Sequence, residues 1–298
     1  MYVLALTAVP AALRAQDSIA PPPYVFTLPA SVRSVGMGGA GAALVGDAGA
    51  LFSNPAGLAT IHHLALEGAY RAAPGGARFF TGALGWRLSQ FDLGIGGRYF
   101  KFGTDPAQYV GPEAPAGSNT REALGVGSLV YRYGLIALGV SGRYASRSID
   151  SVRVRGVSGD VGLTIALFDI MALGFSIQNI GGNWRESSTL AMPRLTRLGF
   201  TMNYVDPQES FRLLSTFEVQ WPAEYAARFV AGVEAGIVLE GVGIVGRVGY
   251  GGEAPGFPNS KFSFGGSVNV GALKVDYAYR HHDLLGERAH HIGLRLTL

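Results

Sequence analysis

The chain has 298 residues, of which only 15 % are charged and 44 are glycine, and it has no cysteine, which excludes disulfides and thiolate chemistry. The formal net charge is +3 without a run of lysine or arginine, a pattern that argues against nucleic-acid binding. Although 48 % of the residues are hydrophobic, no stretch after the N-terminus has the ~20 consecutive apolar residues of a membrane helix. A high content of apolar residues without an apolar helix indicates strands in which apolar and polar residues alternate.

Residues 1–15 are predicted to be a signal peptide. The apolar run over residues 2–13 is too short to span a bilayer but suits the apolar region of a secretion signal. Cleavage after Ala15 would leave Gln16 or Asp17 at the mature N-terminus. The run lacks the usual preceding lysine or arginine, and a buried strand or helix is the alternative.

Residues 16–60 do not alternate in polarity, and we predict an extended linker followed by a hatch inside a barrel. The linker begins with three consecutive prolines, residues 21–23. The glycine run that follows resembles a dinucleotide-binding loop only superficially, because that loop needs a strand before it and a helix after it. Small residues instead favour close packing inside a glycine-lined lumen.

Residues 61–298 repeat a period of two, which predicts strands because successive side chains point to opposite faces. For example, Leu198, Phe200 and Met202 alternate with Arg197 and Gly199. We expect about fourteen strands, beginning near residues 62, 78, 91, 122, 134, 157, 170, 195, 211, 226, 241, 261, 272 and 289. An even number fits a closed antiparallel barrel without exposed edges. The predicted fold is therefore all-β, a transmembrane antiparallel β-barrel with an N-terminal segment plugging its lumen.

The connections between the predicted strands alternate in length. Tight turns, such as residues 88–90 and 132–134, alternate with mostly longer connections, and the short ninth connection at 222–224 breaks the trend. The longer ones are residues 72–76, 103–121, 145–155, 181–193, 251–260 and 281–288. Long loops on one rim and short turns on the other are typical of bacterial outer-membrane barrels. We therefore expect the chain to reside in the outer membrane, in contact with its lipid.

The two faces of the predicted strands differ in chemistry. The apolar face carries aromatic residues near strand ends, as expected for the girdles at membrane interfaces: Tyr70, Trp86, Tyr99, Tyr144, Tyr204, Trp221 and Tyr250. A charge on the lipid face costs about 2–4 kcal/mol at the midplane, so the charged residues are predicted to face the lumen. They are Asp92, Arg98, Arg143, Asp160, Arg197, Arg212, Glu218, Arg228, Glu234, Arg247, Lys274, Asp276, Arg280 and Arg295.

The hatch carries a motif that resembles the N-terminal signature of the PorV/PorQ family, which is related to the FadL-type fatty-acid transporters. The motif consists of Arg33, Gly36, Met37, Gly38, Gly39, Asp47, Asn54, Pro55, Ala56 and Gly57. Weaker similarity follows at residues 174–181, 193–199 and 275–279 and at His290, so the resemblance spans residues 33–298. It implies a fourteen-stranded barrel whose N-terminal segment folds into the lumen.

The resemblance implies two alternative roles. A PorV/PorQ-like protein would serve type IX protein secretion or surface attachment, with secretion-machinery proteins and cargo as partners. A FadL-like channel would instead pass hydrophobic small molecules, such as long-chain fatty acids, through the lumen and out laterally. A purely structural barrel is the third class. For secretion, the candidate partner loop on the outer rim is 103–121 with Tyr109 and Val110, although a merely solvated loop is equally compatible with its composition.

Two features depart from the family pattern: the outer loops are shorter than those of FadL, and the last residue is Leu298 rather than phenylalanine. No serine elbow or paired carboxylates indicate an enzyme, and no cofactor is expected. His281, His282 and His290 flank one predicted loop. They are hydrated rim histidines or, alternatively, metal ligands.

Overall fold

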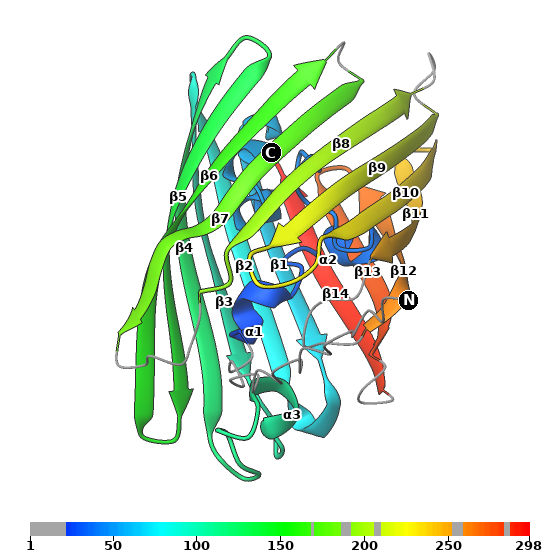
Figure 1. The fold of residues 1–298 in the computed structure, drawn as a ribbon. Helices are drawn as coiled ribbons and strands as arrows, with labels where there is room; N and C mark the ends of the chain where they lie inside the picture. Colours follow the sequence, from blue (N-terminus) through cyan, green and yellow to red (C-terminus); the bar gives the residue numbers. More distant parts are fainter. Residues whose placement is uncertain (1–21, 168–169, 186–191, 206–209, 252–258, 283–286) are drawn as a thin grey trace, which may run out of the picture.

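The computed structural model describes residues 22–167, 170–185, 192–205, 210–251, 259–282 and 287–298. Fourteen antiparallel strands follow one another around a closed barrel, which β1 and β14 complete by pairing with each other (Figure 1). The strands are β1 Leu64–Ala72, β2 Arg78–Leu88, β3 Phe91–Lys101, β4 Thr120–Tyr133, β5 Ile136–Ile149, β6 Val152–Leu167, β7 Met171–Arg185, β8 Leu195–Val205, β9 Phe211–Pro222, β10 Arg228–Leu239, β11 Val242–Gly251, β12 Asn259–Val270, β13 Leu273–His282 and β14 Glu287–Thr297.

Only short helices accompany the barrel: α1 Tyr24–Thr27, α2 Val32–Gly36, α3 Ala107–Val110 and the 3-10 helices η1 Ala48–Phe52, η2 Pro55–Thr60 and η3 Pro74–Gly76. None of the described helices has the length and hydropathy needed to cross a membrane. The expected all-β fold and strand number are confirmed. Each predicted strand start lies within five residues of the observed one, because the period of two is strongest in the membrane-facing part of each strand.

The connection between β5 and β6 corrects one prediction. Residues 145–155 are mostly strand, and only Asp150 and Ser151 form the turn. Both strands extend past the apolar part of the wall, so their ends lose the apolar alternation and resemble a loop. Strand β7 likewise extends to residue 185, into the expected loop at 181–193, and β13 and β14 extend into the one expected at 281–288.

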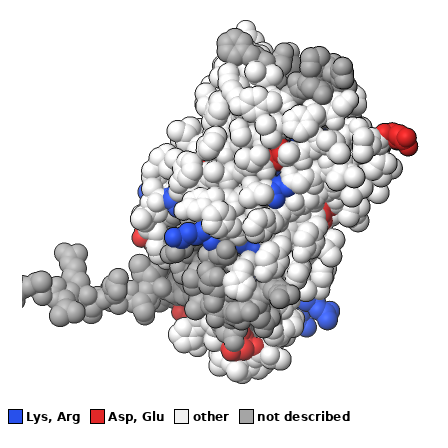
Figure 2. Space-filling view, turned by 90° about the vertical axis from the view of Figure 1, so that its right-hand side faces the viewer, with Lys and Arg blue, Asp and Glu red and all other residues white. Residues whose placement is uncertain are grey.

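The outer surface of the barrel is apolar between its two ends. Large side chains such as Ile95, Leu138, Phe264 and Leu294 are 51–62 % exposed, and Figure 2 shows one face on which charged side chains are few. Six of the seven predicted girdle aromatics are exposed, and Tyr250 is half-buried. Such a surface is stable against lipid but not against water. The chain is therefore a transmembrane barrel of the bacterial outer membrane.

The two ends of the barrel are distinguishable. The start of β1 and the end of β14 lie at the same end, together with short turns such as Ser89-Gln90 and Gly134-Leu135. The opposite end carries α3 and the connection at 102–119 (Figure 1). Since outer-membrane barrels have short periplasmic turns and longer external loops, we call the end with the termini of the barrel the inner end and the other the outer end.

The described part of the hatch, residues 22–60, runs inside the ring of strands, where Figure 1 draws it in blue. Tyr24 in α1 packs against Phe79 and Phe102 near the outer end, and η2 is followed directly by β1 at the inner end. Most of the side chains over residues 31–58 are buried. Residues 1–21, including the predicted signal peptide, lie outside the described residues.

Candidate functional site: the hatch and the lumen wall

Inward-facing charges on the wall meet charges on the hatch, as the alternation of polarity predicts. Three arginines and three acids alternate in a closed ring of ion pairs, all with side chains at most 8 % exposed: Arg33, Asp47, Arg295, Asp276, Arg247 and Glu234. Two members belong to the hatch and four to the wall strands β10, β11, β13 and β14. The equal number of positive and negative charges lets the ring remain buried, because each charge has two opposite neighbours.

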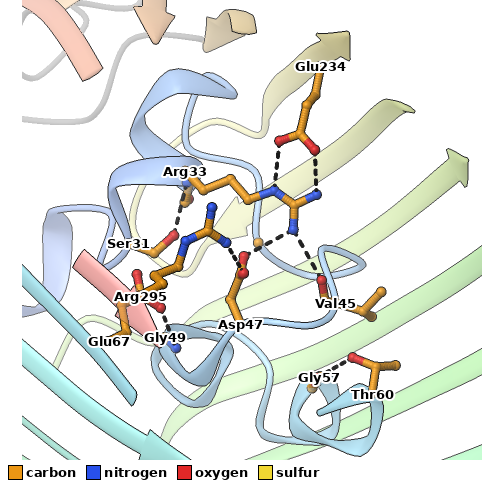
Figure 3. A network of polar contacts seen from close by, with 12 residues as sticks. Ser31, Arg33, Val45, Asp47, Gly49, Gly57, Thr60, Glu67, Glu234 and Arg295 are labelled. Atoms are coloured by element: carbon orange, nitrogen blue, oxygen red, sulfur yellow. Dashed lines mark hydrogen bonds and ion pairs between the residues drawn. The ribbon is translucent and has the colours of Figure 1, made fainter. Parts of the chain in front are cut away.

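Arg33 makes the central contacts of this ring (Figure 3). Its Nε and Nη2 donate to the two carboxylate oxygens of Glu234 at 2.9 and 3.1 Å, and its Nη1 donates to Asp47 at 3.0 Å and to the carbonyl of Val45 at 3.1 Å. Asp47 also accepts from Arg295. A planar guanidinium with several fixed donors suits such a junction better than the single ammonium of lysine.

The ring sets the ionisation of the two hatch residues. Burial alone would raise the pKa of Asp47, but the charges of Arg295 and Arg33 outweigh burial and lower it to about 2. Burial alone would lower the pKa of Arg33, whereas Glu234 and Asp47 raise it above its ordinary value. Both residues are therefore charged at neutral pH, and the hatch is held by charge-assisted hydrogen bonds.

The glycines of the motif lie where the hatch backbone touches the wall backbone. Gly38 has φ +76°, and a Cβ there would lie 2.4 Å from the carbonyl oxygen of Tyr250. On the wall side, a Cβ at Gly249 would lie 2.0 Å from the Gly38 nitrogen. Met37 is fully buried and packs beside Gly232. The glycine run thus serves close packing in the lumen, as the sequence predicts, and its contacts are with protein backbone.

Asn54 begins η2 and connects it to β6. Its Oδ1 accepts from the Ala56 N–H at 3.1 Å, while its Nδ2 donates to the Ala42 carbonyl at 2.6 Å and to Thr164 Oγ1 at 3.2 Å. Pro55 follows at the first helical position, which suits its fixed φ. A Cβ at Gly162 of β6 would lie 2.1 Å from Asn54 Oδ1. The Asn-Pro-Ala-Gly motif, ending at Gly57, therefore fits a groove left by wall glycines.

Tyr109 and Val110 are buried, which corrects the expectation that they are exposed on the outer rim. The connection at 102–119 folds over the outer end of the lumen, because its apolar side chains find partners there. Tyr109 packs with ring-centroid distances of 5.4–6.0 Å in a cluster with four other aromatic residues: Tyr24, Phe79, Phe100 and Phe102. That this loop binds a partner stays a prediction. Neither Tyr109 nor Val110 is exposed, so neither side chain is accessible to such a partner.

A cavity of about 390 Å³ lies on the inner side of the ring. Its lining combines polar and apolar surface and includes the charged side chains of Arg33, Asp47, Arg212 and Lys274. Among the described residues, no group of histidine and acidic side chains has the arrangement of a metal site. The lumen thus has an aromatic outer part and a charged inner part, separated by the hatch.

For several wall residues that hold the hatch, the sequence predicts an inward-facing charge but not the contact with the hatch. Glu218 accepts from the N–H groups of Gly41 and Ala42, each at 2.7 Å, and Arg98 donates to the carbonyls of Leu28 and Pro29. Two further partners were missed altogether: Glu67, which accepts from Gly49, and Glu122, which accepts from Val25. The signal that would have found them is an acidic residue at an inward position of a strand.

No protein-family model matches the sequence, and no curated protein matches it. Among solved structures, the chain is similar to the CymD monoaromatic hydrocarbon channel, with a TM-score of 0.60, 14 % identity and coverage of 91 % of this chain and 97 % of CymD.

Two further solved structures have the same overall fold. The toluene transporter TbuX from Ralstonia pickettii gives a TM-score of 0.58 at 14 % identity, covering 91 % of this chain and 98 % of TbuX. A Pseudomonas aeruginosa FadL homologue gives 0.54 at 15 % identity, covering 91 % and 97 %. These similarities support the broader FadL-like fold, and they do not show the narrower resemblance to the PorV/PorQ family. The chain has the fold of the FadL-like outer-membrane channels.

Proposed function

We propose that this protein is an outer-membrane channel for hydrophobic small molecules, with the hatch as its closing element. The observation that carries the proposal is the buried aromatic cluster at the outer end of the lumen. Tyr24 of the hatch lies among rings from β2, β3 and the connection at 102–119, at centroid distances of 5.4–6.2 Å. A space lined by aromatic faces favours an apolar or aromatic ligand once Tyr24 moves away.

The similar structures support the same role. Two of them are named a monoaromatic hydrocarbon channel and a toluene transporter, and both are channels or transporters rather than enzymes. Type IX secretion rests on the motif resemblance alone. The channel, which is the alternative in the sequence analysis, is therefore the preferred function.

A hydrophobic molecule would not pass readily through the charged ring, so we propose an exit through the wall. The described pairing of β7 with β8 runs only from Met171 to Gln178, although β7 continues to residue 185. At the end of this ladder Asn179 and Gly181 have positive φ values of 60° and 66°. A pocket between Phe26 of the hatch and Leu195 opens at this place. The proposed exit lies where this described ladder ends.

Ligand binding tests the proposal directly. Purified protein in detergent is equilibrated with deuterated toluene or a long-chain fatty acid, and the retained ligand is quantified by mass spectrometry. Wild type and the lipid-facing control Phe264→Ala should retain it, whereas Phe100→Asp, which places a charge in the cluster, should not. Equal retention by Phe100→Asp and wild type, or no retention of either ligand by wild type, would refute the proposal.

A further inference from the structure

The outer ends of three neighbouring strands carry basic side chains on the lipid-facing side. Arg78 of β2 is the register partner of Lys101 of β3, which is in turn the partner of Arg121 of β4. The adjacent residues Phe79 and Phe100 are buried in the lumen. Because side chains alternate along a strand, the three basic residues point outward, and all three are exposed.

The row continues across β5 to β6. Ser148 is the partner of Arg121, and Arg153 is the partner of Ser148. Arg155 points outward two residues further along β6 and is also exposed. We call these five residues the basic row: Arg78, Lys101, Arg121, Arg153 and Arg155. Within the described part of the chain, none of them has an ion-pair partner.

The basic row is electrostatically unfavourable by itself. Like charges directly opposite one another destabilise an antiparallel pair, and here three cations stand on consecutive strands. The acids of the described strands β2–β6 face the lumen, and none shares the outward positions. Acids also occur in the connections at this end: Asp105 and Glu113 lie in the connection at 102–119, and Asp150 lies at the tip of the β5–β6 hairpin, where it accepts from the Asn119 N–H. An external anion is the group that would relieve the repulsion.

The height of the basic row on the barrel indicates which kind of anion lies within its reach. Phe80 and Tyr99 face each other two residues closer to the inner end, and both are exposed to lipid. From Phe79 to Leu88 a tilted strand rises about 25 Å along the barrel axis, which is the usual height of the apolar belt. Arg78 and Lys101 therefore lie at the outer edge of the belt, at the level of the head groups of the outer leaflet.

Among the residues that the structure describes, the other side of the barrel lacks such a row. Near the outer ends of β9 to β13, the outward-facing side chains are aromatic: Trp221, Phe229, Tyr250, Phe262 and Tyr279. Exposed cations also occur elsewhere at this end, at Arg194 before β8 and at Lys261 on β12, but they lie on strands that are not neighbours. Arg78, Lys101 and Arg121 are instead direct register partners on consecutive strands, which points to one ligand bound on that side.

We propose that the basic row binds the phosphate groups of a lipid head group in the outer leaflet. Arginine pairs with phosphate through two parallel hydrogen bonds, and basic residues at a membrane surface attract anionic lipids. Strands are about 4.8 Å apart, so the row from β2 to β6 extends about 19 Å. That length accommodates a head group with two phosphates on a disaccharide, with its acyl chains against Phe80, Tyr99 and Ile95.

Native mass spectrometry of the full barrel tests this inference with three probes: lipid A carrying two phosphates, the same lipid with its phosphates removed, and zwitterionic phosphatidylethanolamine. Wild type should retain the phosphorylated lipid preferentially. Lys101→Gln/Arg121→Gln should reduce its retention about tenfold or more, since two surface cations are lost. The control Arg194→Gln/Lys261→Gln removes two exposed cations elsewhere and should retain the lipid like wild type.

Heat-modifiable migration on a gel establishes that each variant is a folded barrel. If Lys101→Gln/Arg121→Gln does not fold, Arg153→Gln/Arg155→Gln provides the same comparison on β6. Retention of phosphorylated lipid by the folded variant at the wild-type level would overturn the inference. Equal binding of phosphorylated and dephosphorylated lipid by wild type would overturn it as well.

Discussion

Arg33 and Glu234 lie 201 residues apart in the sequence, and two hydrogen bonds of 2.9 and 3.1 Å join their side chains inside the barrel. Glu234 also accepts from Arg247 at 2.6 Å, so one carboxylate connects the hatch to two neighbouring strands of the wall. This pair links the N-terminal motif directly to the barrel.

Arg33→Gln is expected to release the hatch. It leaves Asp47 and Glu234 buried with one cation fewer, and breaking a buried ion pair from one side costs about 3–5 kcal/mol. Limited proteolysis should cut the hatch much faster than in wild type, while the barrel keeps its folded migration on a gel. The exposed Arg194→Gln is the control. A hatch as resistant as in wild type would show that the ring does not hold it.

Gly162→Ala is expected to disturb the same docking at another point. Its Cβ would lie 2.1 Å from Asn54 Oδ1, which needs a shift of η2. Gly142→Ala is the matched control, because nothing lies within 4 Å of a Cβ at that position of the neighbouring strand. Hydrogen exchange of residues 54–60 should rise in Gly162→Ala alone. Equal exchange in both variants would contradict the tight contact.

The contribution of Asp47 to the docking of the hatch should depend on pH only under strongly acidic conditions. The pKa of Asp47 falls from 3.8 to about 2 when the hatch is docked. Its stabilising contribution is therefore fully present above pH ~4 and is lost as the pH falls through about 2. A fluorophore on a single cysteine at position 27 should report release in that window. Asp47→Asn should flatten this response, and an unchanged response would exclude Asp47 as its source.

Much of this arrangement follows from the sequence, because a strand in a bilayer permits charge on one face only. That constraint predicts the inward position of Glu234 and Arg295 and the apolar outer belt. It does not predict the pairing of Arg33 with Glu234, which depends on how the hatch is oriented inside the lumen. A local sequence pattern does not predict the position of Tyr109 either, because its aromatic partners come from α1, β2 and the residue that follows β3.

Tyr24→Ala is expected to create a ligand-sized cavity in the aromatic cluster. Removing a buried aromatic side chain costs about 3–5 kcal/mol when the space stays empty, and apolar cavities of this kind bind small aromatic molecules. Toluene should therefore bind more tightly to this variant than to wild type, as measured by retention in detergent. Phe264→Ala on the lipid face should not change the affinity. Weaker toluene binding by Tyr24→Ala would contradict a ligand site at the cluster.

The most direct test of the channel proposal locks the hatch to the wall. The chain has no cysteine of its own, and a Cβ at Gly199 would lie 3.4 Å from that of Ala43, close to disulfide geometry. In intact cells that express Ala43→Cys/Gly199→Cys, uptake of a hydrophobic fluorescent probe should stop on oxidation and return on reduction. If the fully cross-linked protein takes up the probe as fast as the same protein with its cysteines reduced, the result would contradict a channel that the hatch closes.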